Sequence, residues 1–264
     1  MKDPEKATRP NQSSEKLLTV VEVMSRQNGP VKLQELARKL SMNVSTVLRF
    51  VTALQNKGYA AQEAETGRYY LTYKICGIAN RIISHVDLRN VAAPYLRSIA
   101  QIFGESANLS IEQNRMVVYI EVLNGPNQML TTLQRIGNIA PLHCTGVGKL
   151  FLLNYSEQQI DRLIAQRGLQ KFTDHTLITK ESLCTVLNSV QKLGYAFDNE
   201  ECEIGARCVA APIRDYSGKV VAALSVSGPC TRMTDELIYE KLPYLLDAAS
   251  EVSLQLGYSP ADNN

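Results

Sequence analysis

His143 and Cys144, adjacent residues in the middle of the chain, combine a base with a thiol. A cysteine nucleophile needs a base within hydrogen-bond reach of its sulfur. If this pair lies on a strand, the two side chains point to opposite faces and cannot pair directly. The sequence therefore does not predict a thiol enzyme at this position.

A second candidate for chemistry is the acidic group Asp198, Glu200, Glu201 and Glu203. Carboxylates can hold a metal ion, but such a run is more typical of a solvated loop. The sequence has no GxSxG, P-loop or HExxH motif, and its six scattered cysteines form no CxxC pair. We therefore expect no enzyme activity, no metal site and no cofactor.

A glycine-flanked segment, 145–148, indicates a binding site of another kind. It leads into the apolar run 150–153, and if that run opens a helix, free backbone N–H groups there can bind an anion. Ser225 and Ser227 alternate along an expected strand and face one side, and Cys208 opens the neighbouring strand. The pattern predicts a pocket for a small carboxylate. The alternative is that the glycines serve only tight turns and the serines only a strand edge.

The N-terminal third presents side chains that suit DNA. A helix is predicted over 44–56, because Val47, Val51 and Leu54 share one face. The side chains expected to point outward from it are Ser45, Thr46, Arg49 and Thr52. Arginine can donate two hydrogen bonds to a guanine in the major groove, and hydroxyl groups can reach bases or phosphates.

The elements before this helix predict a helix-turn-helix. One helix is expected over 16–27, capped by Ser13 or Ser14, and a second over 33–40. A tight turn at 41–43 then leads into the third helix.

A hairpin, the wing, is predicted after the third helix, because Thr66-Gly67 separates two strand-like runs. Arg68 at its tip and Arg38 on the second helix could contact phosphates or, for Arg68, the minor groove. A three-helix cap with no ligand is the structural alternative.

Charge is unevenly distributed along the chain. Residues 1–74 contain 12 Lys and Arg against 7 Asp and Glu, whereas residues 75–264 contain 16 against 19. A basic N-terminal third favours a polyanion partner for that part alone. The polar stretch 1–15 does not read as a secretory signal, and no apolar run approaches the roughly 18 residues of a membrane span. We expect a cytoplasmic protein with no membrane partner.

The remaining two thirds predict an α+β fold. Residues 75–103 have a helical pattern, in which Pro94 implies a boundary or a first-turn position. Strands and helices then follow without a regular βαβ repeat, which indicates a mainly antiparallel sheet. The expected strands are 107–111, 116–122, 128–134, 208–214 and 220–227, and the expected helices are 156–166, 180–193 and 235–256.

Three blocks of sequence, in order, resemble the IclR family of bacterial transcription regulators over almost the full chain. The segments that carry the resemblance are 40–51 with 67–71, 135–137 with 141–149, and 194–201 with 205–213 and 222–229. The chain departs from the family at Val44 and Leu48, where members often carry a basic residue and a polar or aromatic one. These two residues could belong to the core or could touch thymine methyl groups.

The resemblance implies a linker helix and a C-terminal effector-binding domain similar to a GAF or profilin-like sensor. By the same resemblance, the effector-contacting positions are Met129, Ala140, Gly146, Val147, Asp198, Cys208, Ser225 and Ser227. Asp198 is an unexpected neighbour for an anionic effector, because like charges repel.

These observations predict a tail over 1–12, a winged helix-turn-helix over 13–74, a linker helix over 75–87, an effector-binding domain over 88–258 and a tail over 259–264. The predicted function is a repressor or activator of a catabolic operon. It would bind a pseudo-palindromic operator as a homodimer or homotetramer, under the control of a small organic acid. Two alternatives stay open: a constitutive DNA-binding protein whose second domain only oligomerises, and an enzyme with a DNA-binding head.

Overall fold

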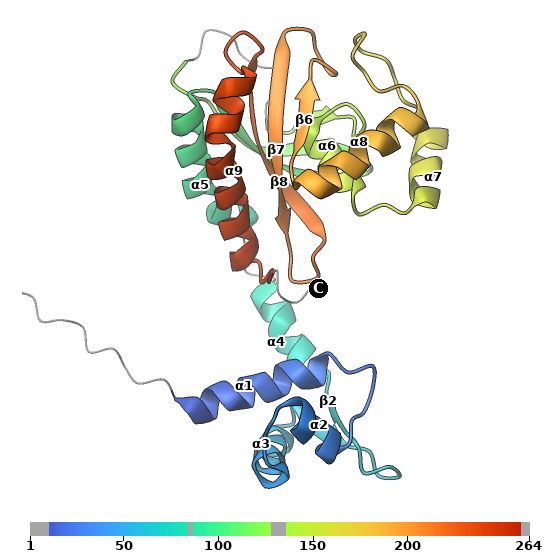
Figure 1. Cartoon of the computed structure of the whole chain (residues 1–264), viewed down its shortest axis with the longest axis vertical. Coiled ribbons are helices and arrows are strands. Elements are labelled where there is room, and N and C mark those ends of the chain that lie inside the picture. The colour runs from blue at the N-terminus through green and yellow to red at the C-terminus, as the bar shows by residue number, and fades with distance from the viewer. Residues whose placement is uncertain (1–10, 84–86, 128–135, 260–264) are drawn as a thin grey trace, which may run out of the picture. The chain divides into compact units, whose positions relative to one another are not determined.

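The computed structural model describes residues 11–83, 87–127 and 136–259. The chain divides into two compact units, Met1–Val86 and Asp87–Asn264 (Figure 1). Within the described ranges, no helix is both long and apolar enough to cross a membrane.

The first unit is a winged helix-turn-helix, as predicted. Its elements are α1 (Gln12–Ser25), α2 (Leu33–Lys39), α3 (Val44–Asn56), β1 (Ala60–Gln62), β2 (Tyr69–Leu71) and α4 (Lys74–Ile83). The start predicted for the first helix is wrong, since α1 begins at Gln12. Its cap is the side chain of Asn11, which accepts hydrogen bonds from the backbone N–H groups of Ser13 and Ser14.

The core of the first unit holds α3 in place. Val47 and Val51 of α3 are fully buried against Val20 of α1 and Leu36 of α2. One face of α3 is thereby committed to the interior, so its opposite face is left to solvent.

The start of α4 is anchored within the first unit. The ammonium group of Lys74 donates a 2.5 Å hydrogen bond to the backbone oxygen of Lys57, at the end of α3. The same group lies 4.7 Å from the centre of the Tyr59 ring. The expected linker helix therefore begins on the first unit.

The described residues of the second unit form a six-stranded sheet with the order β5-β4-β3-β8-β7-β6, in which all neighbours are antiparallel. The α+β prediction with an antiparallel sheet is confirmed. The strands are β3 (Ser106–Gln113), β4 (Met116–Leu123), β5 (Ile139–Ala140), β6 (Ala196–Asn199), β7 (Ala206–Arg214) and β8 (Val220–Pro229). The helices are α5 (Leu88–Phe103), α6 (Gly146–Leu152), α7 (Glu157–Arg167), α8 (Lys180–Leu193) and α9 (Asp235–Gln255).

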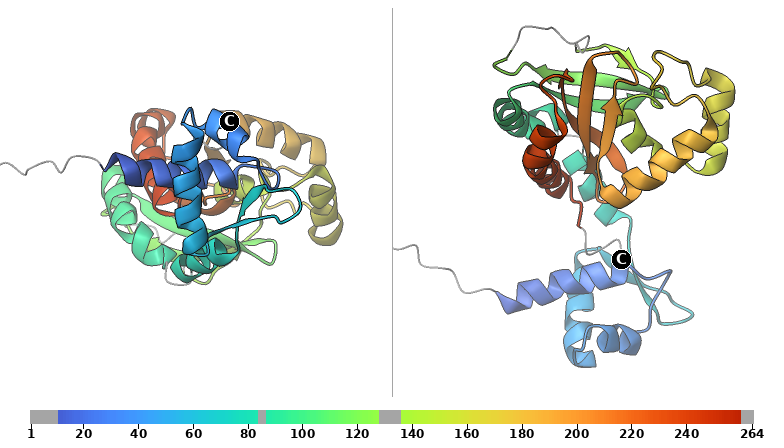
Figure 2. Two further views of the ribbon diagram at one scale, coloured as in Figure 1. Left: turned by 90° about the horizontal axis from the view of Figure 1, so that it is seen from below. Right: turned by 45° about the horizontal axis from the view of Figure 1, so that its top comes forward.

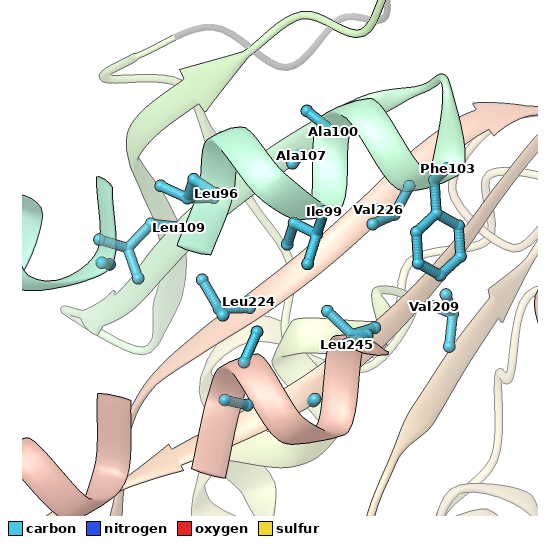
Figure 3. Packing of buried hydrophobic residues seen from close by; sticks show 14 of the residues in the cluster. Leu96, Ile99, Ala100, Phe103, Ala107, Leu109, Val209, Leu224, Val226 and Leu245 are labelled. Carbon is cyan, nitrogen blue, oxygen red and sulfur yellow. The ribbon is translucent and has the colours of Figure 1, made fainter. Parts of the chain in front are cut away.

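Helices cover both faces of this sheet (Figures 1 and 2). On one face, α5 and α9 lie side by side, and Leu96, Ile99 and Leu245 pack against Leu224 and other residues of the sheet (Figure 3). The other face packs against α6, with α7 and α8 beyond it. Because side chains alternate along a strand, the residues of β7 and β8 divide between these two cores.

The prediction of a boundary or a first-turn position at Pro94 is wrong, because α5 runs from Leu88 to Phe103 and Pro94 lies in its interior. Pro94 lies on the exposed side of the helix, while Ala92, Leu96 and Ile99 are buried. Tertiary packing of that apolar face outweighs the loss of one backbone donor. The strand expected over 128–134 lies outside the described residues.

Candidate functional site

The exposed face of α3 forms the candidate DNA-binding surface of the first unit. Ser45, Arg49 and Thr52 are exposed on it, and Thr46 is half-buried beside them. The sequence did not decide whether Val44 and Leu48 are core or surface residues. Both are on the surface, with exposed fractions of 43% for Val44 and 40% for Leu48. In this chain they are therefore available to thymine methyl groups and are not core residues.

A hollow of about 310 Å³ lies beside this face, between the start of α1 and α3. It is lined by Gln12, Ser13, Lys16, Thr46, Arg49 and Phe50. The sequence interpretation did not include Gln12 and Lys16. Assigning Asn11 as the N-cap of the first helix would have placed both residues at the start of α1.

The two remaining basic residues of the predicted DNA-binding set are exposed on neighbouring elements. Arg38 lies in the last turn of α2, and Arg68 follows Gly67 at the tip of the β1–β2 hairpin. The ammonium group of Lys39, next to Arg38, instead pairs with the Glu35 carboxylate at 3.2 Å.

The second unit contains a cavity of about 390 Å³ on the α6 side of the sheet. Its lining residues are Tyr119, Asn138, Ile139, Ala140, Pro141, Thr145, Phe172, Asp198, Cys202, Glu203, Ala206, Arg207, Cys208 and Ser227. They come from β4, β5, the segment before α6, β6, β7 and β8, and from the loops that join these elements.

Four of the predicted effector positions line this cavity: Ala140, Asp198, Cys208 and Ser227. Three of them form a row across the sheet, because Asp198 pairs with Cys208 and Cys208 pairs with Ser227. Antiparallel partners place their side chains on the same face, so this register brings residues from three strands to one wall of the cavity.

Three other predicted positions are buried next to lining residues and are not themselves part of the described lining. Gly146 packs close to the sheet, since a Cβ there would lie 3.2 Å from the backbone oxygen of Ala196. Val147 belongs to the core between the sheet and α6–α8, and Ser225 lies two residues before Ser227 on β8. Met129 falls outside the described residues.

Asn108 of β3 joins the two serines. Its amide nitrogen donates to the hydroxyl oxygens of Ser225 and Ser227, at 3.4 and 3.3 Å. Ser227 lines the cavity, so this fully buried amide connects the cavity wall to the centre of the sheet. The sequence interpretation did not include Asn108, because β3 reaches β8 across more than a hundred residues of chain.

Asp198 is the titratable group of greatest interest in the cavity. Burial raises the pKa of its carboxyl group to about 7, from 3.8. Its Oδ1 atom accepts hydrogen bonds from the backbone N–H groups of Glu201 (2.9 Å) and Cys202 (3.4 Å). The side chain is therefore partly protonated near neutral pH while it also organises the loop that follows β6.

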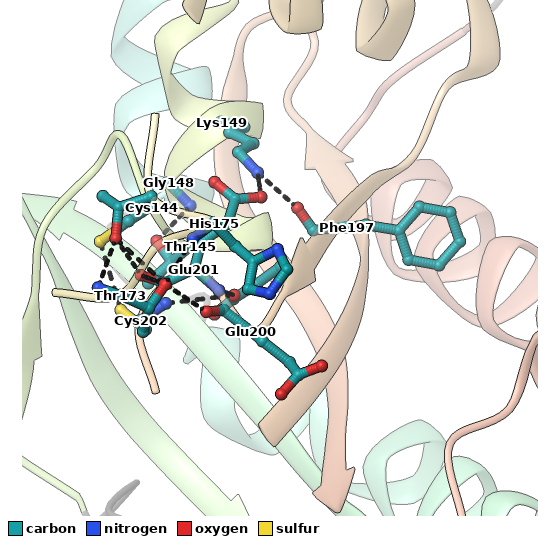
Figure 4. Close-up of polar contacts among 12 residues, drawn as sticks. Cys144, Thr145, Gly148, Lys149, Thr173, His175, Phe197, Glu200, Glu201 and Cys202 are labelled. Carbon is teal, nitrogen blue, oxygen red and sulfur yellow. Dashed lines mark hydrogen bonds and ion pairs between the residues drawn. The ribbon is translucent and has the colours of Figure 1, made fainter. Parts of the chain in front are cut away.

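The acidic group around that loop is not wholly solvated, in contrast to the sequence prediction. The sequence predicts a solvated loop, but Asp198 and Glu201 are buried. Glu201 forms an ion pair with Lys149 of α6, which is 1% exposed and also donates to the backbone oxygen of Phe197 at 2.7 Å (Figure 4). Within the described ranges, no group of three or more His, Cys, Asp or Glu side chains could hold a metal ion.

Two threonine hydroxyl groups fix the same loop from the other side. Thr173 donates to the backbone oxygen of Glu200 at 2.6 Å (Figure 4). Thr176 donates to the backbone oxygen of Glu201 at 2.7 Å. The wall of the cavity that contains Cys202 and Glu203 is thus held by contacts from both α6 and the segment before α8.

His143 and Cys144 lie in an irregular segment before α6, so the alternation of side chains along a strand does not apply to this pair. The imidazole Nε2 of His143 bonds to the backbone oxygen of Gln170 at 3.0 Å, and burial lowers the pKa of this ring. The Cys144 sulfur lies 3.2 Å from the sulfur of Cys202. The base and the thiol thus have separate partners.

The predicted effector positions did not include most of the other lining residues, among them Tyr119, Asn138 and Arg207. Asn138 adjoins β5, which at two residues is too short to show any periodicity. Arg207 lies beside Cys208, within one of the segments that carry the family resemblance. Its guanidinium group donates to the backbone oxygen of Met233 at 3.0 Å and packs 5.5 Å from the centre of the Phe197 ring.

A winged helix-turn-helix with an exposed polar face on α3, joined to a domain with an internal cavity, is the organisation of a ligand-responsive transcription regulator. Comparison with protein families agrees. Residues 13–64 match the IclR helix-turn-helix domain, and residues 80–254 match the bacterial transcriptional regulator IclR C-terminal domain. The chain belongs to the IclR family.

Individual relatives span nearly the whole chain. The acetate operon repressor of Salmonella typhimurium is 33% identical over 248 residues, covering 93% of this chain and 90% of the repressor. The transcriptional regulator KdgR of Escherichia coli is 33% identical over 228 residues, 86% of each chain. The crystal structure of the Thermotoga maritima IclR matches with a TM-score of 0.62 and 30% identity, over 94% of this chain and 99% of that one.

Proposed function

We propose that the protein is a repressor of a catabolic operon that binds a pseudo-palindromic operator as a homo-oligomer. The observation that carries this proposal is the exposed face of α3, with Ser45, Arg49 and Thr52 pointing to solvent beside Val44 and Leu48. Repression is favoured by the relative that is named an acetate operon repressor. Such a protein acts in the cytoplasm, where the operator is.

The side chains of this face divide into base-reading and backbone-contacting groups. In the proposal, Arg49 donates two hydrogen bonds to a guanine, with Ser45, Thr46 and Thr52 around it. Arg38 and Arg68 lie on neighbouring elements and suit phosphate contacts, which set the register of the protein on DNA. One such face reads one half-site, so a two-fold oligomer reads an inverted repeat.

Selection from random DNA identifies the operator and tests its symmetry. DNA fragments bound by the full-length protein are selected from a random pool through several rounds and sequenced. We expect enrichment of an inverted repeat whose half-sites are separated by about one helical turn or a multiple of it. An unenriched pool, or a single unrepeated half-site, contradicts the proposal of a two-fold operator.

We further propose that a small organic acid binds in the cavity and changes operator affinity. Asp198, Cys208 and Ser227 supply the polar wall, while Tyr119 and Ile139 belong to an apolar one. Because the pKa of Asp198 is raised to about 7, its carboxyl group can carry a proton and donate a hydrogen bond to a hydroxy- or keto-acid. A protonated Asp198 removes the like-charge conflict with an anionic effector.

The other predicted positions have roles at the same site. In the proposal, the backbone amides of Gly146 and Val147 receive the effector carboxylate, and Ser225 acts through the Asn108 amide that it shares with Ser227. Ala140 lines the apolar part, and Met129, which falls outside the described residues, stays a predicted position. An effector that binds one arrangement of the two units better than another shifts the operator affinity by that difference.

A thermal-shift screen of small hydroxy- and keto-acids tests the effector site. An acid that binds the folded state raises the unfolding temperature, and at 100 times its Kd it adds about 2.7 kcal/mol to stability. In the Ser225→Ala/Ser227→Ala double variant, the loss of hydrogen bonds worth about 0.5–1.5 kcal/mol each should weaken the binding of the same acid. Operator binding should persist in this variant.

The screen also separates the two alternatives. A second domain that only oligomerises gives no shift with any acid, and an enzyme converts the acid into a product that mass spectrometry detects. An acid that shifts the wild-type protein and the double variant equally places the effector site elsewhere than beside these serines.

A further inference from the structure

Two thiols from distant parts of the sequence meet beside the cavity. The sulfur atoms of Cys144 and Cys202 lie 3.2 Å apart, although the residues are 58 positions apart in sequence (Figure 4). Cys144 directly precedes Thr145, the residue that caps α6, and Cys202 belongs to the loop between β6 and β7. Cys202 lines the cavity, whereas Cys144 is fully buried behind it.

We propose that Cys144 and Cys202 are a reversible redox pair, which forms a disulfide when a peroxide enters the cavity. The two sulfur atoms need to approach by about 1.2 Å to reach the disulfide bond length of about 2.05 Å. Among the hydrogen bonds between described residues, no other one joins two sulfur atoms. Cys208 also lines the cavity, but its thiol interacts with Ser227 and Ser225.

The order of events follows from access to the cavity. The sulfur of Cys202 attacks one peroxide oxygen, the O–O bond breaks, and the thiol proton leaves with the second oxygen as water, so that Cys202 becomes a sulfenic acid. The sulfur of Cys144 then attacks the sulfur of Cys202, the S–O bond breaks, and a second water leaves with the Cys144 proton. Two thiols lose two electrons, and hydrogen peroxide is reduced to two water molecules.

Several ionisable groups surround the pair. The carboxylates of Glu201 and Glu203 and the partly ionised Asp198 lie beside Cys202 in the loop and on β6, and Glu201 is paired with Lys149 of α6. Hydrogen peroxide is small and uncharged, so it can reach Cys202 whatever the protonation state of these groups. The hydrogen bond with Cys144, burial and the nearby Asp198 and Glu201 raise the pKa of the Cys202 thiol, so the reaction is slow and responds to sustained oxidation.

The disulfide would join two walls of the cavity. It links the loop that holds Cys202 and Glu203 to the segment that ends at Thr145, and all three of these residues line the cavity. An acid bound in the cavity would therefore shield Cys202 from peroxide. This consequence rests on the proposed function, whereas the formation of the disulfide does not.

Peroxide treatment of the full-length protein tests the pair. Cys76→Ser is used as the background, because Cys76 is the exposed thiol that could link two chains. We expect an intramolecular loss of about 2 Da that maps to a Cys144–Cys202 peptide. We also expect a rise of about 5–10 °C in the unfolding temperature of the treated protein, because the bond closes a long loop. Dithiothreitol should reverse both changes.

Serine variants in the Cys76→Ser background identify the two cysteines that form the disulfide. Cys144→Ser and Cys202→Ser should each abolish the mass loss, and Cys184→Ser, a half-buried thiol on α8, should leave it unchanged. A bond between Cys202 and Cys208, oxygen addition at Cys202 without a disulfide, or unreacted thiols would each overturn the proposal.

One further measurement separates this proposal from the proposed function. The rate of the mass loss is measured with and without those acids that shift the unfolding temperature in the screen, and we expect such acids to slow it at least several-fold. If no acid in the screen binds, the effector proposal fails while the disulfide is still tested by the variants. If an acid binds and leaves the rate unchanged, Cys202 does not face the effector.

Discussion

Asp198 is the residue at which structural and binding roles meet. Its Oδ1 atom holds the loop after β6 through two backbone N–H groups, which favours a carboxylate or an amide at this position. Its burial disfavours the charged form and raises its pKa to about 7. The residue is therefore positioned to report pH in the stability of the second unit.

We expect Asp198→Asn to flatten the dependence of stability on pH. The folded pKa of about 7 lies above the unfolded value of 3.8, so the unfolded chain releases a proton that the folded chain retains across this window. The wild-type protein should lose about 2–3 kcal/mol of stability through this group between pH 5 and pH 8. Asparagine keeps the acceptor oxygen and removes the titration. Urea unfolding of both proteins at the two pH values measures the difference.

Burial also raises the pKa of Glu201, which both proteins contain, so the comparison rests on the difference between the two proteins. An equal loss of stability in wild-type and variant proteins between pH 5 and pH 8 would show that Asp198 is ionised throughout. In that case its carboxylate could not donate a hydrogen bond to an effector.

Arg49 tests the DNA-binding face at the same scale. Arg49→Ala should weaken operator binding by about 1–3 kcal/mol, because a guanidinium group that donates twice to a guanine is removed. Since Arg49 is exposed, folding should hardly change. Gel-shift titrations compare the selected operator with random DNA, and Arg162→Ala, an exposed arginine on α7, serves as the control. Equal operator affinity of Arg49→Ala and wild-type protein would remove Arg49 from the base-reading set.

At the scale of elements, the position of α6 depends on two glycines. The helix lies against β6 and β7, with Gly146 close to the sheet and Gly148 against the segment before the helix. A methyl group on Gly148 would lie 2.3 Å from the backbone oxygen of Leu142, and one on Gly146 would lie 3.2 Å from that of Ala196. The side chain of Thr145 caps the helix through the Gly148 N–H at 3.1 Å.

We expect Gly148→Ala to destabilise the second unit by about 2–4 kcal/mol, because the methyl group overlaps a backbone atom that has little room to move. Gly146→Ala is the matched variant on the same helix. Its contact requires a shift of only a few tenths of an ångström, so its cost should be about 1 kcal/mol. Urea unfolding followed by circular dichroism compares the two, and equal losses would show that α6 can move away from the sheet.

The order and type of these elements could be predicted from the sequence, because apolar periodicity and cap residues are local signals. The helix predicted over 44–56 matches α3, and the hairpin over 208–227 matches β7 and β8. Pro94 shows the limit of local signals, since packing on the far side of α5 keeps the helix continuous.

The site could be predicted only in part, because its residues come from segments that are far apart in the sequence. The row of Asp198, Cys208 and Ser227 requires the register of three strands, which alternation within one strand does not determine. The buried pair of Lys149 and Glu201 joins residues 52 positions apart, and without its partner an acidic loop is expected to be solvated.

At the scale of the whole molecule, charge is divided between the two units. The excess of Lys and Arg over 1–74 contrasts with the slight excess of Asp and Glu over 75–264. Phosphate contacts should thus come from the DNA-binding unit, and the effector unit should add little to the attraction. Affinity for DNA should then fall linearly with salt on a double-logarithmic plot, with a slope of about −0.9 for each phosphate contacted.

Arg68→Ala separates phosphate contact from base reading in this salt dependence. Arg68 is exposed at the hairpin tip, so we expect its loss to weaken binding to all sequences about equally and to reduce the salt slope by about one. Arg49→Ala should instead reduce the preference for the selected operator over random DNA. Titrations of the three proteins between about 50 mM and 200 mM salt measure both quantities. If Arg68→Ala leaves the slope unchanged, or if the wild-type slope is near zero, the hairpin does not contact the DNA backbone and the excess of positive charge has no part in binding.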